Sequence, residues 1–163
     1  MRQTEIERKF LVCGDGWRGK GTAVKFRQGY IARAWNRTVR VRLAGGRGVL
    51  NIKYRSGSIS RSEFEYEIPP EEAQALLDGL DPSEIIEKTR HTFEELGSTW
   101  EVDEFEGANA GLVIAEIELA SEDQPFERPS WLGEEVSRIS RYFNAELSRM
   151  PYSLWSEEEK APR

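Results

Sequence analysis

Charged side chains at alternate positions are the feature of this sequence that could do chemistry. Carboxylates recur in this way in three segments, at Glu5, Glu7, Glu63, Glu65, Glu116 and Glu118. Hard divalent cations such as Mg²⁺ or Mn²⁺ prefer oxygen ligands, so we predict that these carboxylates, with Asp103 as a further candidate, ligate such a metal. Cationic side chains recur in the same way and could hold phosphate oxygens; they are Lys9, Arg40, Arg42, Lys53, Lys88 and Arg90.

Together the two sets suit phosphoryl transfer, in which catalysis is mainly positioning and charge neutralisation. No side-chain nucleophile is required, because a metal can lower the pKa of a bound water. We therefore predict activity that is lost in chelator and restored by Mg²⁺ or Mn²⁺. It should rise toward alkaline pH while Lys9, Lys53 and Lys88 keep their charge near pH 9. His91, the single histidine, is predicted to have no role in proton transfer.

Alternation with a period of two is the spacing of β-strands, in which successive side chains point to opposite faces. The pattern predicts eight strands, at about 5–12, 24–32, 37–44, 48–56, 61–68, 86–93, 98–105 and 113–120. Turn-forming residues separate several of them, as at Gly45–Gly48, which predicts an antiparallel meander. Two helices are predicted. One begins at Pro69–Glu72, and the other runs from about Gly133 to Arg149, where Val136, Ile139, Phe143 and Leu147 form an apolar stripe.

One solvated face of an ordinary sheet explains the alternation in any single strand better than a binding site does. Six strands together weaken that explanation, because several of them carry charges of one sign only. Like charges two residues apart on one face repel each other, which gains a purely structural sheet nothing. On this view, replacing Glu116 or Glu118 by alanine should abolish turnover with little loss of fold. We predict an α+β fold in which eight antiparallel strands close into a barrel, with a polar, charged lumen and helices packed outside.

The composition limits the class of protein. The chain has 163 residues, which suggests a single domain, predicted at 1–155, followed by a polar tail at 156–163. A single cysteine, Cys13, excludes an intrachain disulfide and fits a reducing cytosol. The acidic residues near the N-terminus do not fit a signal peptide, so we expect a cytoplasmic protein. A net charge of −6 argues against a nucleic acid partner, and no run of apolar residues is long enough for a membrane span.

A series of short motifs in a fixed order resembles those of the CYTH superfamily, the triphosphate tunnel metalloenzymes. The first motif, Glu5-Ile6-Glu7-Arg8-Lys9, is similar to the ExExK signature of that superfamily. The others follow as Arg27-Gln28-Gly29-Tyr30, Arg40-x-Arg42, Asn51-Ile52-Lys53, Glu63-Phe64-Glu65-Tyr66-Glu67-Ile68, Glu87-Lys88-Thr89-Arg90, Glu101-x-Asp103, Glu116-x-Glu118, Trp131-x-Gly133 and Arg141-Tyr142-x-Asn144. The resemblance covers roughly residues 3–150.

The resemblance implies an eight-stranded antiparallel tunnel that binds triphosphate compounds and divalent metal. Short bacterial members of the superfamily look like inorganic triphosphatases. Carried over, the resemblance implies the metal ligands and phosphate contacts named above, with catalysis by Glu5, Glu7, Lys9, Lys53 and Arg90. Tyr30 looks like the tyrosine near the tunnel mouth in short relatives, and would contact substrate. Relatives often carry an aspartate where this chain has Ile139, which puts a polar closing role of the C-terminal helix in doubt.

We therefore predict metal-dependent hydrolysis of tripolyphosphate to pyrophosphate and phosphate. Thiamine triphosphatase and class IV adenylyl cyclase remain alternatives on the same fold, although no residue that would recognise adenine is evident. A module that binds polyphosphate or nucleotide without turnover is an alternative of a different class. The expected partner is a small molecule that contains a triphosphate, with neither a nucleic acid nor a membrane, and the sequence is compatible with a homodimer.

Overall fold

The alternating segments of the chain form strands. The structure is a computed structural model that describes residues 3–55 and 60–160, and the side chains of these residues except those of 3–5, 55, 60 and 61. Its first eight strands are β1 (Gln3–Val12), β2 (Thr22–Ala34), β3 (Arg37–Ala44), β4 (Arg47–Arg55), β5 (Ser60–Ile68), β6 (Ile85–Glu95), β7 (Ser98–Phe105) and β8 (Val113–Leu119). All eight predicted strands are confirmed, with ends that agree to within about two residues.

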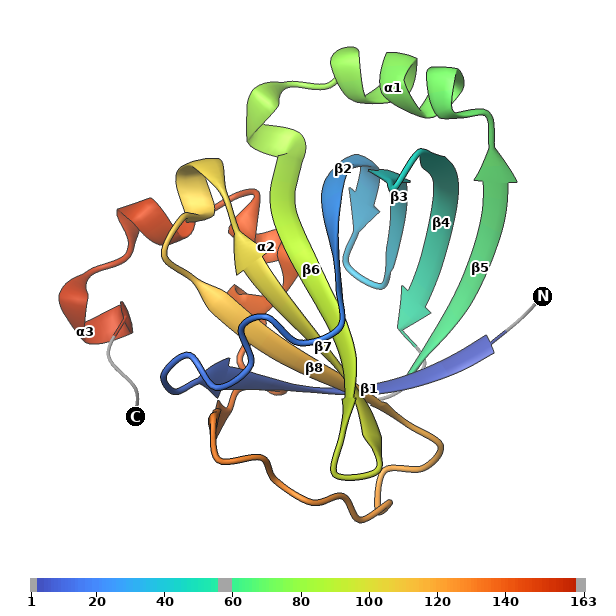
Figure 1. Ribbon diagram of the computed structural model, residues 1–163. Helices are drawn as coiled ribbons and strands as arrows, with labels where there is room; N and C mark the ends of the chain where they lie inside the picture. Colours follow the sequence, from blue (N-terminus) through green and yellow to red (C-terminus); the bar gives the residue numbers. More distant parts are fainter. Residues whose placement is uncertain (1–2, 56–59, 161–163) are drawn as a thin grey trace.

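One antiparallel sheet contains these strands and a ninth, β9 (Leu132–Glu135), in the order β5-β4-β3-β2-β6-β7-β8-β1-β9. The sheet curls so strongly that β5 meets β1 (Figure 1). In the described part of the chain, this contact joins only Gln3–Ile6 to Ser60–Glu63. The predicted eight-stranded closed barrel is therefore not what the structure has. The reason is that β1 pairs with β8 along one edge and shares its other edge between two strands. On that second edge, Gln3–Ile6 pair with β5, and Phe10 and Val12 pair with β9.

The helix predicted from Gly133 to Arg149 is wrong. The segment begins with β9 and continues through the 3-10 turn η3 (Ser140–Tyr142) to the short helix α2 (Asn144–Leu147). The open edge of β1 explains this choice, because its main-chain groups need partners. The main-chain N–H of Val136 donates to the carbonyl oxygen of Lys9 at 2.8 Å, and the Lys9 N–H donates to Ser137 Oγ at 2.9 Å.

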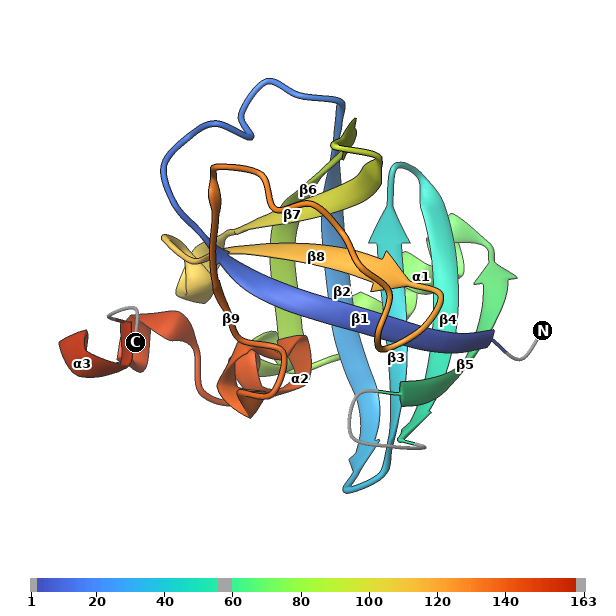
Figure 2. The same ribbon diagram turned by 90° about the horizontal axis from the view of Figure 1, so that it is seen from below.

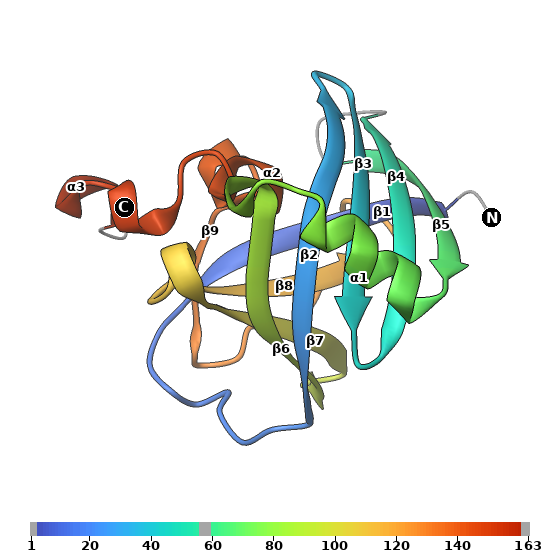
Figure 3. The ribbon, with the colours of Figure 1, turned by 90° about the horizontal axis from the view of Figure 1, so that it is seen from above.

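The first predicted helix is confirmed as α1 (Pro70–Asp78), which lies outside the sheet across β3 and β4 (Figure 3). Its Ala73 and Leu77 are buried against Val41. The approach is so close that a Cβ at Gly48 of β4 would lie 2.8 Å from the Cβ of Ala73. The remaining helical segments are short: η1 (Pro82–Glu84), η2 (Gly107–Asn109), η4 (Tyr152–Leu154) and α3 (Glu157–Lys160). Within the described ranges, no helix has the length and apolar character to cross a membrane.

The main hydrophobic clusters lie on both sides of the sheet. Loops that precede β2 and follow β8 bring Trp17 and Trp131 over the outer side of β1, β7 and β8 (Figure 2). There the two indoles join Phe10 and Trp100 in one buried cluster. A second cluster lies on the inner face, where the chain after β9 packs Val136 and its neighbours against Ile86, Phe105 and Ile114. These three share that face with Lys88 and Glu116. Because Phe10 and Ala115 turn outward into the first cluster, the alternate side chains Lys9 and Glu116 turn inward.

Candidate active site

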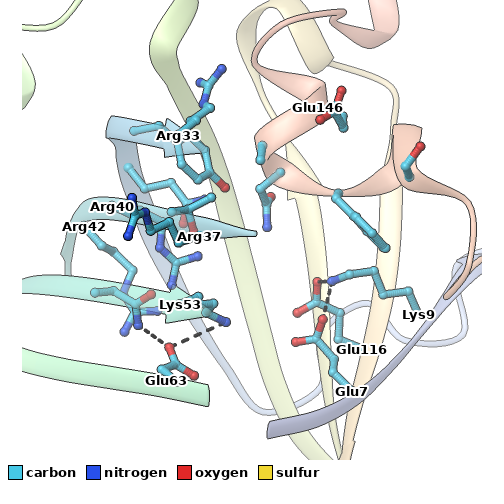
Figure 4. Close-up of a pocket in the computed structure, with 18 of the residues that line it drawn as sticks. Glu7, Lys9, Arg33, Arg37, Arg40, Arg42, Lys53, Glu63, Glu116 and Glu146 are labelled. Atoms are coloured by element: carbon cyan, nitrogen blue, oxygen red, sulfur yellow. Dashed lines mark hydrogen bonds and ion pairs between the residues drawn. The ribbon is translucent and has the colours of Figure 1, made fainter. Parts of the chain in front are cut away.

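The inner face of the curled sheet surrounds a cavity of about 630 Å³. Figure 4 shows the cationic side chains of β3 and β4 on one wall, facing the Glu7–Lys9–Glu116 group of β1 and β8 across the cavity. The structure brings twelve of the predicted site residues into the lining, which are Glu7, Lys9, Tyr30, Arg40, Arg42, Lys53, Glu63, Glu65, Lys88, Arg90, Glu116 and Glu118. The described lining holds nine cationic and seven acidic side chains, although the whole chain carries −6. The lining therefore has an excess of positive charge, which suits the binding of an anion.

Two predicted site residues stand apart from this group. Glu5 belongs to β1, but its side chain lies outside the described residues. Asp103 is fully buried, with an exposed fraction of 0%. Its carboxylate is bonded to Arg90 and Lys88 behind the cavity surface, and it is not among the described lining residues. Direct ligation of a metal by Asp103 is therefore not supported, because its carboxylate is fully buried and does not reach the described lining of the cavity.

Lys9 lies between two carboxylates at one wall of the cavity. Its ammonium is 2.5 Å from Glu7 Oε1 and also bonds Glu116, which is 5% exposed (Figure 4). Burial alone would lower the pKa of Lys9, but the charges of Glu116 and Glu7 outweigh it and raise that pKa. Burial would likewise raise the pKa of Glu116, yet Lys9 and Arg90 hold it well below its ordinary value. At neutral pH the Lys9 ammonium and the Glu116 carboxylate are therefore both charged.

Arg90 joins three carboxylates on neighbouring strands. Its Nε and one terminal nitrogen donate to the two oxygens of Asp103, each at 2.7 Å. The same terminal nitrogen also donates to Glu116 Oε2 at 2.7 Å, and the other one bonds Glu101. Burial would lower the pKa of Arg90, but the charges of Asp103 and Glu116 raise it well above its ordinary value. These four contacts fix the plane of the guanidinium, so Arg90 presents its charge in one direction.

Lys88 is almost fully buried, at 1% exposure, and its ammonium bonds Asp103. Burial lowers its pKa to about 8, because the charge of Asp103 only partly offsets it and Arg90 repels the ammonium. The expectation that Lys88 keeps its charge near pH 9 is therefore wrong. Sequence spacing shows which face Lys88 occupies, but not how dry its surroundings are.

The opposite wall is formed by β3, β4 and β5. Arg42 donates to Glu65 Oε1 at 3.0 Å, and Lys53 lies 3.5 Å from Glu63 Oε1. Burial lowers the pKa of Arg42, and the neighbouring charge of Arg40 adds to that effect. Both cations are thus in contact with carboxylates of β5, while their guanidinium and ammonium groups still face the cavity (Figure 4).

Several lining residues were missed by an argument built on charge alternation. Gln28 and Asn51 are uncharged amides, each 1% exposed, at inward positions of β2 and β4. Glu101 lies two residues before Asp103, and burial raises its pKa. Rim residues come from the β2–β3 hairpin and from the segment around α2; they are Arg33, Trp35, Arg37, Glu146 and Arg149. The spacing of the rim residues has no period. Only the inward phase of Gln28, Asn51 and Glu101 could have been recognised.

His91 points away from the cavity. It packs edge-on against Trp17, with ring centroids 4.9 Å apart, on the outer side of β6. Its Nε2 is 3.8 Å from Glu104 Oε2 on the same outer side. This position supports the prediction that His91 takes no part in proton transfer.

A divalent cation fits the donors that the cavity offers. Among the described residues no ready-made cluster of three or more histidine, cysteine or acidic side chains is present. Glu7 and Glu116 nevertheless converge on one point, and the Lys9 ammonium occupies the position that a metal ion could take there. Carboxylate oxygens are the ligands that Mg²⁺ and Mn²⁺ prefer. Glu7 and Glu116 are therefore the described side chains best placed to hold such a metal.

Comparison with known proteins agrees with this geometry. A family model described as the CYTH domain matches residues 3–152. An inorganic triphosphatase of Acetivibrio thermocellus is 48% identical over 153 residues, which cover 94% of this chain and 98% of that protein. An inorganic triphosphatase of Nitrosomonas europaea is 36% identical over 149 residues, which cover 89% of this chain and 97% of that protein. The crystal structure of the inorganic triphosphatase NE1496 superposes with a TM-score of 0.67, at 34% identity over 88% of this chain and 93% of that one. This chain therefore belongs to the CYTH domain family.

Proposed function

We propose that this protein hydrolyses inorganic tripolyphosphate to pyrophosphate and phosphate inside the cavity. The observation that carries the proposal is the pairing of two unlike walls around one space of about 630 Å³. Arg40, Arg42 and Lys53 on one wall suit the oxygens of a polyanion, and Glu7 and Glu116 on the other suit a divalent cation. The two curated relatives named inorganic triphosphatase support the same substrate.

Each part of the lining has a role in this proposal. The oxygen of an attacking water forms a bond to the terminal phosphorus, and the bond from that phosphorus to the bridging oxygen breaks, which releases pyrophosphate. Arg90 and Lys88 hold the phosphate on the floor of the cavity, with Arg40, Arg42 and Lys53 along the opposite wall. Each charge-assisted hydrogen bond contributes about 1.5–3 kcal/mol. Several together favour a long anion over a single phosphate.

The metal would be held by Glu7 and Glu116, with Glu5, Glu63, Glu65 and Glu118 as further candidates. When bound, Mg²⁺ or Mn²⁺ supplies neutralisation of phosphate charge and a lower pKa for water. Tyr30, buried beside Arg33 with the guanidinium 4.6 Å from the ring centroid, would contact the substrate near the rim. Burial raises the pKa of Tyr30, so its hydroxyl keeps its proton and can donate to a phosphate oxygen.

Phosphate release from a panel of substrates tests the proposal. We expect release from tripolyphosphate in Mg²⁺ or Mn²⁺, loss of activity in chelator, and recovery when metal is restored. ATP and thiamine triphosphate in the same assay distinguish an organic triphosphate as the preferred substrate. His91→Ala should match the wild type, because that ring lies outside the cavity. Absence of release from tripolyphosphate with either metal would contradict the proposal.

Lys88 is expected to give triphosphate binding an alkaline limit. Its pKa in the folded protein is lowered to about 8, so its charge is present below that pH and is lost above it. Affinity for tripolyphosphate should fall about tenfold or more between pH 7 and 9, the loss of one charge-assisted bond. Calorimetry should show that Lys88→Arg removes this fall. Lys25→Arg, at an exposed pair with Glu106, is the control and should keep it.

A further inference from the structure

We propose that Asp103 is a positioning residue, which fixes the directions of Arg90 and Lys88 toward the substrate and does not itself ligate metal. The proposal rests on the function proposed above. Asp103 lies on β7, directly opposite Arg90 on β6 in the register of the two strands. Arg90 and Lys88 are two residues apart, so they share the inner face of β6.

The carboxylate of Asp103 uses both oxygens on these two cations. Oδ1 accepts from Arg90 Nε at 2.7 Å, and Oδ2 accepts from a terminal nitrogen of Arg90 at 2.7 Å and from the Lys88 ammonium. A two-point contact of this kind fixes the plane of a guanidinium, which a single bond does not. The remaining donors of Arg90 are thereby aimed at Glu101 and Glu116, which line the cavity.

Charge balance gives the second argument. Two cations that share one face at this spacing repel each other, and both are nearly or largely buried. Asp103 offsets one of their two charges and so reduces this repulsion. A stable core alone would gain more from apolar side chains of similar size at these positions, because buried ion pairs are costly to desolvate. The arrangement is therefore better explained by the need for two oriented cations.

The metal-ligand role that the sequence suggested can be distinguished by experiment. We would compare Asp103→Asn with Glu104→Gln, the next residue of β7, which pairs with Arg18 on the outer side. We expect Asp103→Asn to lower kcat/KM for tripolyphosphate about 100-fold, as removal of outer-shell partners does. Metal affinity, measured by calorimetry without substrate, should stay within about twofold of the wild type, because the hydrogen-bond partners of Asp103 are Arg90 and Lys88 and not a proposed metal ligand. Glu104→Gln should change neither quantity.

A double-mutant cycle shows whether Asp103 acts through Arg90. In an Arg90→Gln background, we expect Asp103→Asn to cost less than about threefold, because Arg90, which Asp103 holds at two points, is already gone and only the single contact to Lys88 is lost. The double variant removes the guanidinium charge of Arg90 together with the carboxylate charge of Asp103. Neither of these two paired groups is then left without the other, so the double variant can be measured if Asp103→Asn alone does not fold. Asp103→Glu, which keeps the charge, should recover part of the activity.

Three results would overturn the proposal. They are a tenfold or larger loss of metal affinity in Asp103→Asn, wild-type kcat/KM in the folded variant, and full additivity in the cycle. If the wild type itself releases no phosphate, the proposed function fails, and calorimetric binding of tripolyphosphate replaces kcat/KM as the readout. Weaker binding in Asp103→Asn, with unchanged metal affinity, would still support the positioning role.

Discussion

Glu116→Gln is expected to abolish tripolyphosphate hydrolysis and also to destabilise the fold. Glu116 is the carboxylate that Lys9 and Arg90 share, and it is almost fully buried. Neutralising it leaves two buried cations without this partner, a change that typically costs about 3–5 kcal/mol. It also removes half of the predicted metal pair, so turnover should fall by about 10²–10³-fold or more. Urea unfolding and phosphate release on the folded fraction measure the two effects.

Glu118→Gln is the matched control, two residues further along β8 and exposed where Glu116 is buried. It should leave the free energy of unfolding nearly unchanged. The sequence led us to expect little loss of fold when either glutamate is removed. For Glu116 that expectation is wrong, because its carboxylate pairs with Lys9 and Arg90. A Glu116→Gln variant as stable as Glu118→Gln would contradict the buried network.

The lowered pKa of Glu116 also determines how the free energy of unfolding should depend on pH. Because the pKa of Glu116 is well below its ordinary value of 4.5 in the fold, its contribution is fully present above that pH. The contribution is lost as pH falls toward the lowered pKa. Wild-type stability should therefore decline in acid more steeply than that of Glu116→Gln.

Lys9→Gln is expected to tighten metal binding while it weakens triphosphate binding. The ammonium of Lys9 occupies the point on which Glu7 and Glu116 converge, so it competes with a divalent cation for the same oxygens. Removing it should raise metal affinity about tenfold, since release of a competing partner worth roughly 1.4 kcal/mol changes the dissociation constant by that factor. Affinity for tripolyphosphate should fall by a similar factor, through loss of one charge-assisted bond.

Stability gives an independent measurement of the same competition. Without metal, Lys9→Gln leaves two carboxylates facing each other and should lower the Tm. Mg²⁺ should then raise the Tm of the variant more than that of the wild type. Lys20→Gln removes the same charge from a pair with Glu95 outside the cavity and should alter neither metal affinity nor the metal-induced shift. Unchanged or weaker metal binding by Lys9→Gln would contradict the competition.

The eight predicted strands and eleven of the twelve predicted lining residues could be recognised because alternation is a local property, whereas Tyr30 came from the family resemblance. Once Lys9 and Glu116 are assigned to strands, the period of two decides which face each one occupies. The pattern cannot say which side chains meet across strands, since that depends on register. Asp103 illustrates the limit: its face was evident, but its position directly opposite Arg90 appeared only with the β6–β7 register.

The helix wrongly predicted at 133–149 shows a second limit. Val136, Ile139, Phe143 and Leu147 have helical spacing, and most of them do pack on the sheet. What the spacing could not include is the open edge of β1, more than a hundred residues earlier in the chain. The main-chain groups on that edge need hydrogen-bond partners, and Leu132–Glu135 supply them by pairing with β1 as a strand.

The edge-sharing of β1 has a consequence for the order in which the protein assembles during synthesis. The hairpins from β2 to β5 and from β6 to β8 join neighbours in the chain, and such local contacts form quickly. β1 leaves the ribosome first, yet Ile6 pairs with Leu119 and Val12 with Leu132. The strand that carries Glu7 and Lys9 must therefore wait for nearly the whole chain. We expect the cation site to be the last part of the molecule to form, and truncated nascent chains to lack it altogether.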